Sequence, residues 1–194
     1  ENRTEQADAL LADLQQSNAD AAAIARQARV SYERGRLAED RIDYAAAKSH
    51  FIRAAQLAPE NADFLQKASD LSDKSGDYAQ GLRFAQDLME LAKPDGEETV
   101  AFARAANWVA YNLNALGRYE EAEPLFRKGL EIRERVLGPD HPDTATSYNN
   151  VAANLYAQDR YAEAEPLYRK GLEIRERVLG LDHPETSHSY NNIG

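Results

Sequence analysis

Pairs of asparagines recur in this sequence at an interval of 42 residues, as Asn149-Asn150 and again as Asn191-Asn192. Inside a helix, asparagine is disfavoured by roughly 0.6 kcal/mol relative to alanine, so a recurring pair needs a reason. Each amide carries both a donor and an acceptor, and a row of amides could bond the backbone of an extended peptide whatever its side chains are. The alternative is that the amides join neighbouring helices, because duplication of the segment would preserve either role equally.

Further candidates lie at the same helical positions in the neighbouring segments. The candidate peptide-binding residues are Arg104, Asn107, Trp108, Tyr111, Asn114, Thr146, Asn149, Asn150, Tyr156, His188, Asn191 and Asn192. Trp108 is the single tryptophan and interrupts the pattern of paired asparagines. It is either an anchor for a ligand side chain or a core residue between two repeated units, and the sequence favours neither.

Residue patterns typical of catalysis or metal binding are absent. Two of the four histidines, His141 and His183, are copies in the same His-Pro turn, where capping of a helix explains them well. No two histidines have metal-ligand spacing within one helix, and the sequence has neither a phosphate-binding glycine loop nor a nucleophile elbow. We therefore predict a protein that is not an enzyme, with no catalytic residues, no metal site and no cofactor.

Composition and charge limit the kinds of partner that we expect for this protein. The formal net charge is −10, so the average field repels a phosphate backbone and nucleic acid is not an expected partner. The sequence has no cysteine, which excludes disulfides and is compatible with a reducing compartment; we expect a cytoplasmic location. No apolar run approaches the ~20 residues that span a bilayer, so no membrane partner is expected. Because the chain stops inside a copied segment, we expect it to be a fragment of a longer protein. We also expect self-association through that end.

A long internal repeat dominates the second half of the chain. Residues 118–138 read RYEEAEPLFRKGLEIRERVLG, and residues 160–180 read RYAEAEPLYRKGLEIRERVLG. The match continues through His141-Pro142 against His183-Pro184. Near-identity at a fixed offset indicates one supersecondary unit copied along the chain, and hence a stack of such units with a long surface and no single deep pocket.

The same unit extends upstream. Tyrosines at 44, 78, 119 and 161 are each followed three positions later by a small residue, namely Ala47, Gly81, Ala122 and Ala164. An aromatic residue follows four positions further on in three of the four segments, which places these positions on one helical face. Small residues there would let a neighbouring helix approach closely. With little glycine and proline and much alanine, leucine, glutamate and arginine, the composition favours helix almost throughout.

On these residues the chain resembles a tetratricopeptide repeat array, whose unit is a helix–turn–helix of about 34 residues. Residues 28–61 fit the pattern, and the 42-residue copies resemble more narrowly the kinesin light chain-like subgroup. The resemblance implies an all-α fold, a right-handed superhelical solenoid of antiparallel helix pairs in which the first helix of each pair lines a concave groove. It also implies that groove asparagines contact cargo peptides.

The predicted organisation is an N-terminal capping or linker helix over 1–27 and a repeat array over 28–194. The array units are expected at about 28–61, 62–97, 98–142, 143–184 and, in part, 185–194. First helices are predicted at 28–40, 62–74, 98–116 and 143–157, with a last, truncated first helix from about 185. Second helices are predicted at 44–57, 78–92, 120–137 and 162–179. In residues 1–26, an approximate 4–3 spacing of apolar residues is interrupted by Ser17-Asn18. For this segment we favour a packed or capping helix over the second helix of an earlier unit or a coiled-coil end.

The functional prediction follows from the surface and the resemblance. We expect a protein–protein interaction module that binds a peptide or partner protein in its concave groove, without catalysis. The alternative is a scaffold or regulatory repeat domain of a larger signalling or effector protein, acting by intramolecular packing or self-association.

Overall fold

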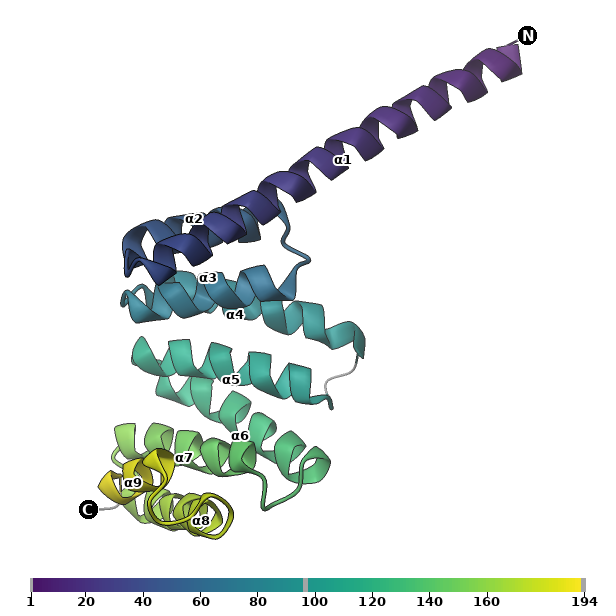
Figure 1. Cartoon of the computed structure of the whole chain (residues 1–194). Helices are drawn as coiled ribbons and strands as arrows, with labels where there is room; N and C mark the ends of the chain where they lie inside the picture. The colour runs from purple at the N-terminus through teal and green to yellow at the C-terminus, as the bar shows by residue number, and fades with distance from the viewer. Residues whose placement is uncertain (1, 96–97, 193–194) are drawn as a thin grey trace. The chain divides into compact units, whose positions relative to one another are not determined.

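The computed structural model describes residues 2–95 and 98–192, with side chains from Gln16 onward apart from that of Asp95. These residues form α-helices joined by short turns, with one 3₁₀ turn, η1 (Lys93–Asp95), and no strand among them. The all-α prediction is confirmed, since the helices come in antiparallel pairs (Figure 1). The chain divides into two compact units, Glu1–Ser75 and Gly76–Gly194, which are described one at a time.

Unit 1 contains α1 (Asn2–Asp40), α2 (Tyr44–Leu57) and α3 (Ala62–Lys74). The second half of α1 packs along α2 at a point where Gly35 meets the ring of Phe51; a Cβ at residue 35 would lie 2.8 Å from that ring. The side chains of Asp43 and Asn61 accept hydrogen bonds at the N-termini of α2 and α3, as capping residues do. The ranges of α2 and α3 are those predicted from the sequence.

The first helix differs from its prediction. α1 runs without a break through Ser17-Asn18, because serine and asparagine each disfavour a helix by only a few tenths of a kcal/mol and alanines surround them. Residues 16–27 expose their side chains, and the first buried residue is Ala28. Residues 16–27 therefore lack the burial of a packed helix, and packing begins at Ala28. A linker helix over 1–27, the other form of the prediction, stays a prediction, and the side chains of residues 1–15 lie outside the described ones.

Unit 2 contains α4 (Tyr78–Ala92), α5 (Val100–Ala115), α6 (Tyr119–Val136), α7 (Pro142–Ala157), α8 (Tyr161–Leu179) and α9 (Pro184–Asn191). The stack of these helices follows their order in the chain (Figure 1). Its largest core cluster combines aliphatic residues of the first helices, such as Val109 and Val151, with Phe126 and Tyr168 of the second helices. Since each recurrent tyrosine begins a second helix, the sequence markers gave these helix starts to within one residue.

Two glycines further along the second helices allow neighbouring helices to approach closely. A Cβ at Gly129 on α6 would lie 3.3 Å from the carbonyl oxygen of Ala103 on α5, and a Cβ at Gly171 on α8 would lie 3.1 Å from that of Ala145 on α7. The two repeats thus pack their helix pairs in the same register.

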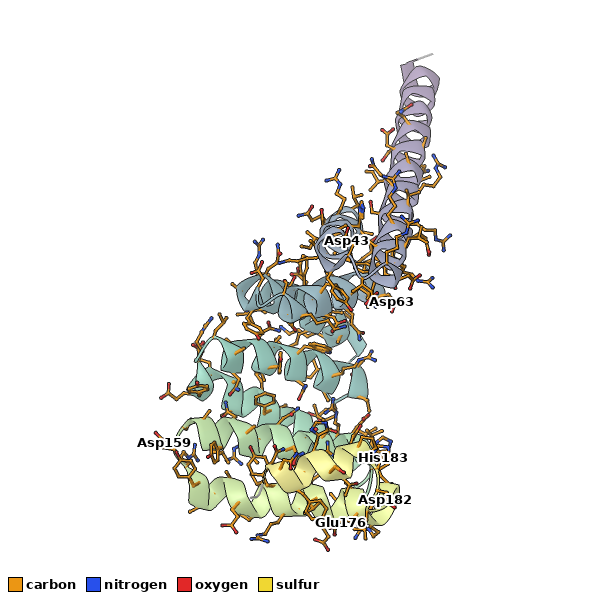
Figure 2. All side chains as sticks on the ribbon, turned by 60° about the vertical axis from the view of Figure 1, so that its left-hand side comes forward. Asp43, Asp63, Asp159, Glu176, Asp182 and His183 are labelled. Carbon is orange, nitrogen blue, oxygen red and sulfur yellow. The ribbon has the colours of Figure 1, made fainter. Side chains whose placement is uncertain are left out.

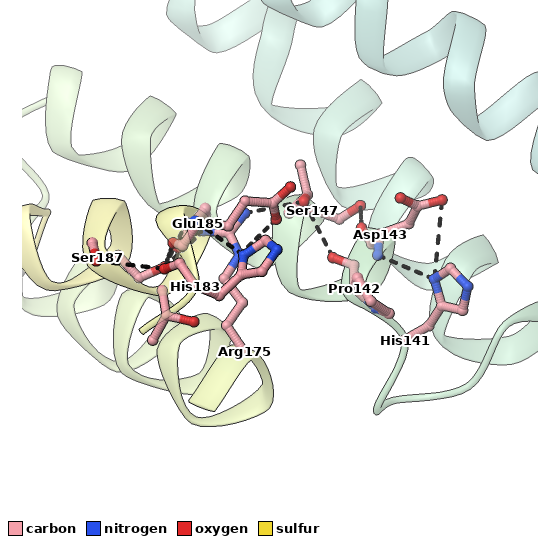
Figure 3. Close-up of polar contacts among 12 residues, drawn as sticks. His141, Pro142, Asp143, Ser147, Arg175, His183, Glu185 and Ser187 are labelled. Carbon is pink, nitrogen blue, oxygen red and sulfur yellow. Dashed lines mark hydrogen bonds and ion pairs between the residues drawn. The ribbon is translucent and has the colours of Figure 1, made fainter. Parts of the chain in front are cut away.

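Copied glycine, His-Pro and threonine residues build the long turn between one helix pair and the next. His141 and His183 each accept a hydrogen bond at Nδ1 from the backbone N–H two residues on, at 3.1 and 3.2 Å, so the predicted capping role of both is confirmed (Figure 3). The hydroxyls of Thr144 and Thr186 donate back to the carbonyls of Gly138 and Gly180. These turns lie at the opposite end of the helices from Asp159, in the α7–α8 turn (Figure 2).

Candidate functional site

The predicted binding residues all belong to unit 2 and to the first helices of its pairs. α5 carries Arg104, Asn107, Trp108, Tyr111 and Asn114, α7 carries Thr146, Asn149, Asn150 and Tyr156, and α9 with its C-terminal cap carries His188, Asn191 and Asn192. We call the surface presented by these three helices the first-helix face. The structure divides the predicted residues into those that join the helices and those that reach solvent.

One amide pair joins α5 to α7 at the surface. Nδ2 of Asn150 donates to Oδ1 of Asn107 at 2.7 Å, and both side chains are half-buried. The pair uses one donor and one acceptor. Nδ2 of Asn107 and Oδ1 of Asn150 have no hydrogen-bond partner among the described residues, so one donor and one acceptor remain for a ligand.

A second amide pair is structural. Asn154 is 0% exposed and donates through Nδ2 to Oδ1 of Asn114 at 2.9 Å and to the carbonyl of Tyr119 at 3.0 Å. Its own Oδ1 accepts from Nε2 of Gln158 at 2.7 Å. A buried polar side chain with all these groups paired fixes the helices relative to one another. Asn114 is thereby engaged at the edge of the first-helix face.

Asn149 is an exception to the expectation that both members of a pair line the open surface. It is 8% exposed, and its Nδ2 donates to Oγ of Ser189 at 3.4 Å. Its Oδ1 lies 2.8 Å from where a Cβ of Gly171 would sit, so the amide is enclosed between α7, α8 and α9. The correction has a simple cause, because adjacent residues of a helix point about 100° apart and only one of the two can face solvent here.

Aromatic side chains lie on the same two helices as the half-buried pair of Asn107 and Asn150, or near their ends. Trp108 is half-buried against the core cluster, and its ring meets that of Tyr111 edge-on at 6.5 Å. Tyr111 is 47% exposed, and Tyr156 on α7 is 56% exposed beside Tyr161, at 4.7 Å between ring centres. The hydroxyl of Tyr161 donates to Asp159 at 2.6 Å, and this hydrogen bond raises the pKa of Tyr161.

The remaining predicted residues lie in different surroundings. Arg104, His188, Asn191 and Asn192 are exposed. Thr146 is half-buried, and its hydroxyl donates to the carbonyl of Pro142 at 3.2 Å while accepting from Arg175 at 3.1 Å. Thr146 therefore joins α7 to α8 and serves the stack.

Two buried arginines of the second helices were not among the residues predicted from the sequence. Nη1 of Arg133 donates to Oγ of Ser147 at 2.6 Å, and Nη1 of Arg175 donates to Oγ of Ser189 at the same distance (Figure 3 shows Arg175 and Ser147). Both arginines are buried. Their recurrence in the copied RERVLG segment was visible, but charged residues on a helix are usually solvated, so the pattern alone gives no reason to bury them.

The described cavities lie elsewhere. One of about 490 Å³ lies over α2 around His50, and another of about 480 Å³ lies around Arg29 and Asn61; both are in unit 1 and neither includes a predicted binding residue. Over the ranges 2–95 and 98–192, no group of three or more histidine and acidic side chains could hold a metal ion. Nor is any helix in those ranges both long and apolar enough to cross a membrane.

Antiparallel helix pairs, stacked in register through small residues, define an α-helical repeat protein of the helix–turn–helix type. A sequence model of the tetratricopeptide repeat family matches residues 101–177 and 145–194 of this chain. The predicted tetratricopeptide repeat array is thereby confirmed. Proteins of this kind commonly mediate protein–protein interaction and are in general non-catalytic scaffolds.

Solved structures share the fold. BtubC (BKLC) from P. vanneervenii is 21% identical, with a TM-score of 0.70 over 93% of this chain and 81% of that one. A putative kinesin light chain of Podosopora anserina with nearly identical TPR-like repeats is 17% identical, with a TM-score of 0.72 over 88% of this chain and 84% of that one. A Rap protein complexed with competence and sporulation factor is 17% identical, with a TM-score of 0.68 over 86% of this chain and 47% of that one.

Proposed function

We propose that the first-helix face of α5, α7 and α9 binds an extended peptide segment of a partner protein, without catalysis. The observation that carries this proposal is the pair of Asn107 and Asn150, which leaves one amide donor and one amide acceptor together at the surface. A peptide unit has one carbonyl and one N–H. The carbonyl would accept from Nδ2 of Asn107, and an N–H of the same segment would donate to Oδ1 of Asn150.

Exposed tyrosines on the same two helices add contact area. Tyr111 lies one helical turn from Asn107 on α5, and Tyr156 lies nearly two turns from Asn150 on α7. Tyrosines combine an apolar ring with a polar hydroxyl and are frequent among residues that dominate interfaces. We therefore expect main-chain recognition from the amides and side-chain preference from the tyrosines and the exposed edge of Trp108.

The structure narrows the residues that we propose to touch the ligand. They are Arg104, Asn107, Trp108, Tyr111, Asn150 and Tyr156, with His188, Asn191 and Asn192 continuing the face on α9, whereas Asn114 is engaged by Asn154. Asn149 and Thr146 act from within the stack by holding α7 against α8 and α9.

One solved structure with the same fold supports a peptide ligand. The Rap protein with the same fold was solved in a complex with competence and sporulation factor, so a stack of this kind can hold a small partner. We further propose that the partner is a protein or peptide in the cytoplasm, with no nucleic acid and no cofactor.

A peptide library provides the test. Random nonapeptides displayed on phage are selected against the whole chain, and the dissociation constants of synthetic copies are measured for the wild type and for Asn150→Ala. Loss of the amide pair should weaken binding about tenfold, the size of one or two hydrogen bonds that are no longer made. Arg169→Ala, which removes an exposed side chain from the outer face of α8, is the control and should bind as the wild type does. Equal affinity for wild type and Asn150→Ala would show that selected peptides bind elsewhere.

A further inference from the structure

Two clusters of aromatic rings include exposed tyrosines of the first-helix face. In the first cluster, the ring of Tyr111 on α5 lies edge-on to that of Trp108 at 6.5 Å and to that of Tyr78 on α4 at 6.4 Å between ring centres. In the second cluster, the ring of Tyr156 on α7 lies edge-on to that of Tyr161 at 4.7 Å. Tyr111 and Tyr156 are both exposed. Because neighbouring rings hold both tyrosines in place, little side-chain freedom is lost when a ligand covers them.

The two exposed tyrosines belong to helices whose spacing suits one kind of chain. Nδ2 of Asn150 on α7 reaches Oδ1 of Asn107 on α5 at 2.7 Å, and a second amide pair joins the same helices at 2.9 Å. The helix axes therefore lie one helix diameter apart, about 10 Å. A polyproline II helix presents every third residue on the same side and advances about 9 Å over three residues. A β-strand presents every second residue, about 7 Å apart, so the polyproline II repeat is the better match to the step from α5 to α7.

The side-chain polar atoms that α5 and α7 leave unpaired on this face are mostly donors. Nδ2 of Asn107 and Nε1 of Trp108 have no hydrogen-bond partner among the described residues, and neither belongs to the buried atoms without a partner, so both reach solvent. The hydroxyl of Tyr156, which can donate, is also unpaired among the described residues. Oδ1 of Asn150 is an acceptor. A ligand with more carbonyls than N–H groups fits this balance, and proline supplies a carbonyl without an N–H.

We propose that the ligand of the first-helix face is a proline-rich segment in the polyproline II conformation; this inference rests on the proposed peptide-binding function. Prolines three residues apart lie on the rings of Tyr111 and Tyr156, since aromatic surfaces suit this helix. A polyproline II helix has no internal hydrogen bonds, so its carbonyls are available to the donors of α5 and α7. A residue other than proline supplies the N–H that Oδ1 of Asn150 accepts.

The conformation of such a segment favours binding as well. A proline-rich chain already populates the polyproline II helix before it binds, so less conformational entropy is lost than for a flexible peptide. The proline ring carries no polar atom in its side chain, and covering a tyrosine ring with it removes apolar surface from water. Shape and hydrogen bonding thus select the same class of ligand.

The test uses three phage libraries of nonapeptides that differ only in their fixed residues. The first library has proline at every third position, the second has proline at every fourth position, and the third has alanine at every third position. The other positions are random and exclude proline. We expect the whole chain to retain the first library about tenfold better than either of the others, because only its prolines recur at the spacing of α5 and α7.

Two variants locate the preference at the aromatic clusters. Tyr156→Ala removes one exposed ring and should reduce retention of the first library about tenfold, to the level of the others. Trp108→Phe keeps a ring against the core but removes the Nε1–H donor, and it should weaken binding of the first library about fivefold. Tyr44→Ala removes an equally exposed tyrosine from unit 1 and is the matched control, which should keep the preference.

The outcomes separate this inference from the function on which it rests. Asn150→Ala should weaken all three libraries alike, because recognition of the peptide main chain does not depend on the spacing of prolines. Equal retention of the three libraries by the wild type, or an unchanged preference in Tyr156→Ala, would overturn the proline-rich ligand and leave peptide binding standing. If the chain retains none of the libraries, the proposed function fails, and the proline-rich ligand fails with it.

Discussion

Nη1 of Arg175 donates to Oγ of Ser189 at 2.6 Å, and this contact fastens α9 to α8. Both residues are almost completely enclosed, so neither group can exchange its partner for water. Oγ of Ser189 also donates to the carbonyl oxygen of Glu185 at 3.2 Å. The first repeat makes the equivalent contacts between Arg133 and Ser147. The copied segment therefore carries, in its own sequence, the polar contacts that attach each pair of helices to the next.

We predict that Arg175→Ala lowers the free energy of unfolding by about 3 kcal/mol, because it leaves Ser189 and Thr146 with unmatched groups in a buried place. Arg177→Ala, two residues away on the exposed side of α8, should change it by less than about 0.5 kcal/mol. Urea unfolding followed by circular dichroism measures both. Similar stabilities for the two variants would contradict a structural role for the buried arginine.

Glycines at equivalent positions should respond differently to alanine. In Gly171→Ala the new methyl group would lie 2.8 Å from Oδ1 of Asn149 and 3.1 Å from the carbonyl of Ala145, whereas in Gly129→Ala it meets only the carbonyl of Ala103 at 3.3 Å. We expect Gly171→Ala to destabilise by about 1–3 kcal/mol through overpacking. In Gly129→Ala, the roughly 1 kcal/mol gain in helix propensity should offset most of the smaller clash. Melting temperatures compare the pair, and equal losses would show that the two interfaces are packed alike.

Neighbouring asparagines of α7 should separate stability from binding. Asn154→Ala removes three hydrogen bonds from a buried site and is expected to lower the free energy of unfolding by about 2–3 kcal/mol. Asn150→Ala removes one bond at the surface and should lower it by less than about 1 kcal/mol, although it weakens peptide binding. Chemical unfolding of both variants tests this order; a larger loss for Asn150→Ala would make that amide structural as well.

A carboxylate between the repeats should make stability depend on pH. Glu123 on α6 accepts from Arg160 at 2.7 Å, from Gln158 at 3.2 Å and from Arg127 at 2.8 Å. Burial by itself raises the pKa of Glu123, but these hydrogen bonds outweigh it, so the pKa is lowered. A carboxyl group whose pKa is lower in the folded state stabilises that state above its unfolded pKa of about 4.3, and the contribution is lost as the pH falls through the folded value.

The matching experiment compares the wild type with Glu123→Gln. At pH 7 the wild type should be more stable, and the difference should shrink steadily below about pH 4.3 as the carboxylate is protonated. Glu165→Gln, at an exposed pair with Arg169 on α8, is the control and should show little difference at either pH. A gap between wild type and Glu123→Gln that stays constant from pH 7 to pH 3 would mean that the charge contributes nothing.

The sequence by itself determined the helical elements, because the signals for them are local. Residues 44–57, 62–74 and 78–92 are helical as predicted, since the tyrosine and small-residue spacing marks one helical face and Asp43, Asn61 and Asp77 cap the ends. Helix capping in the His-Pro turns could also be predicted from the sequence, because the histidine side chain bonds only the backbone N–H two residues away. The apolar spacing is interrupted at Ser17-Asn18, but the helix is not, because weak propensities do not break a helix that alanines support.

The tertiary structure decided which of these residues face a partner. Asn149 and Asn150 are adjacent and chemically identical, yet one is enclosed by α8 and α9 while the other bonds Asn107 at the surface. Nothing within α7 distinguishes them, because the difference is where the other helices lie. Likewise Arg133 is an ordinary helical arginine until Ser147 is brought beside it from another helix. Local periodicity fixes a helix and its faces, but only the packing of one helix on the next determines which polar groups are used up and which are left for a ligand.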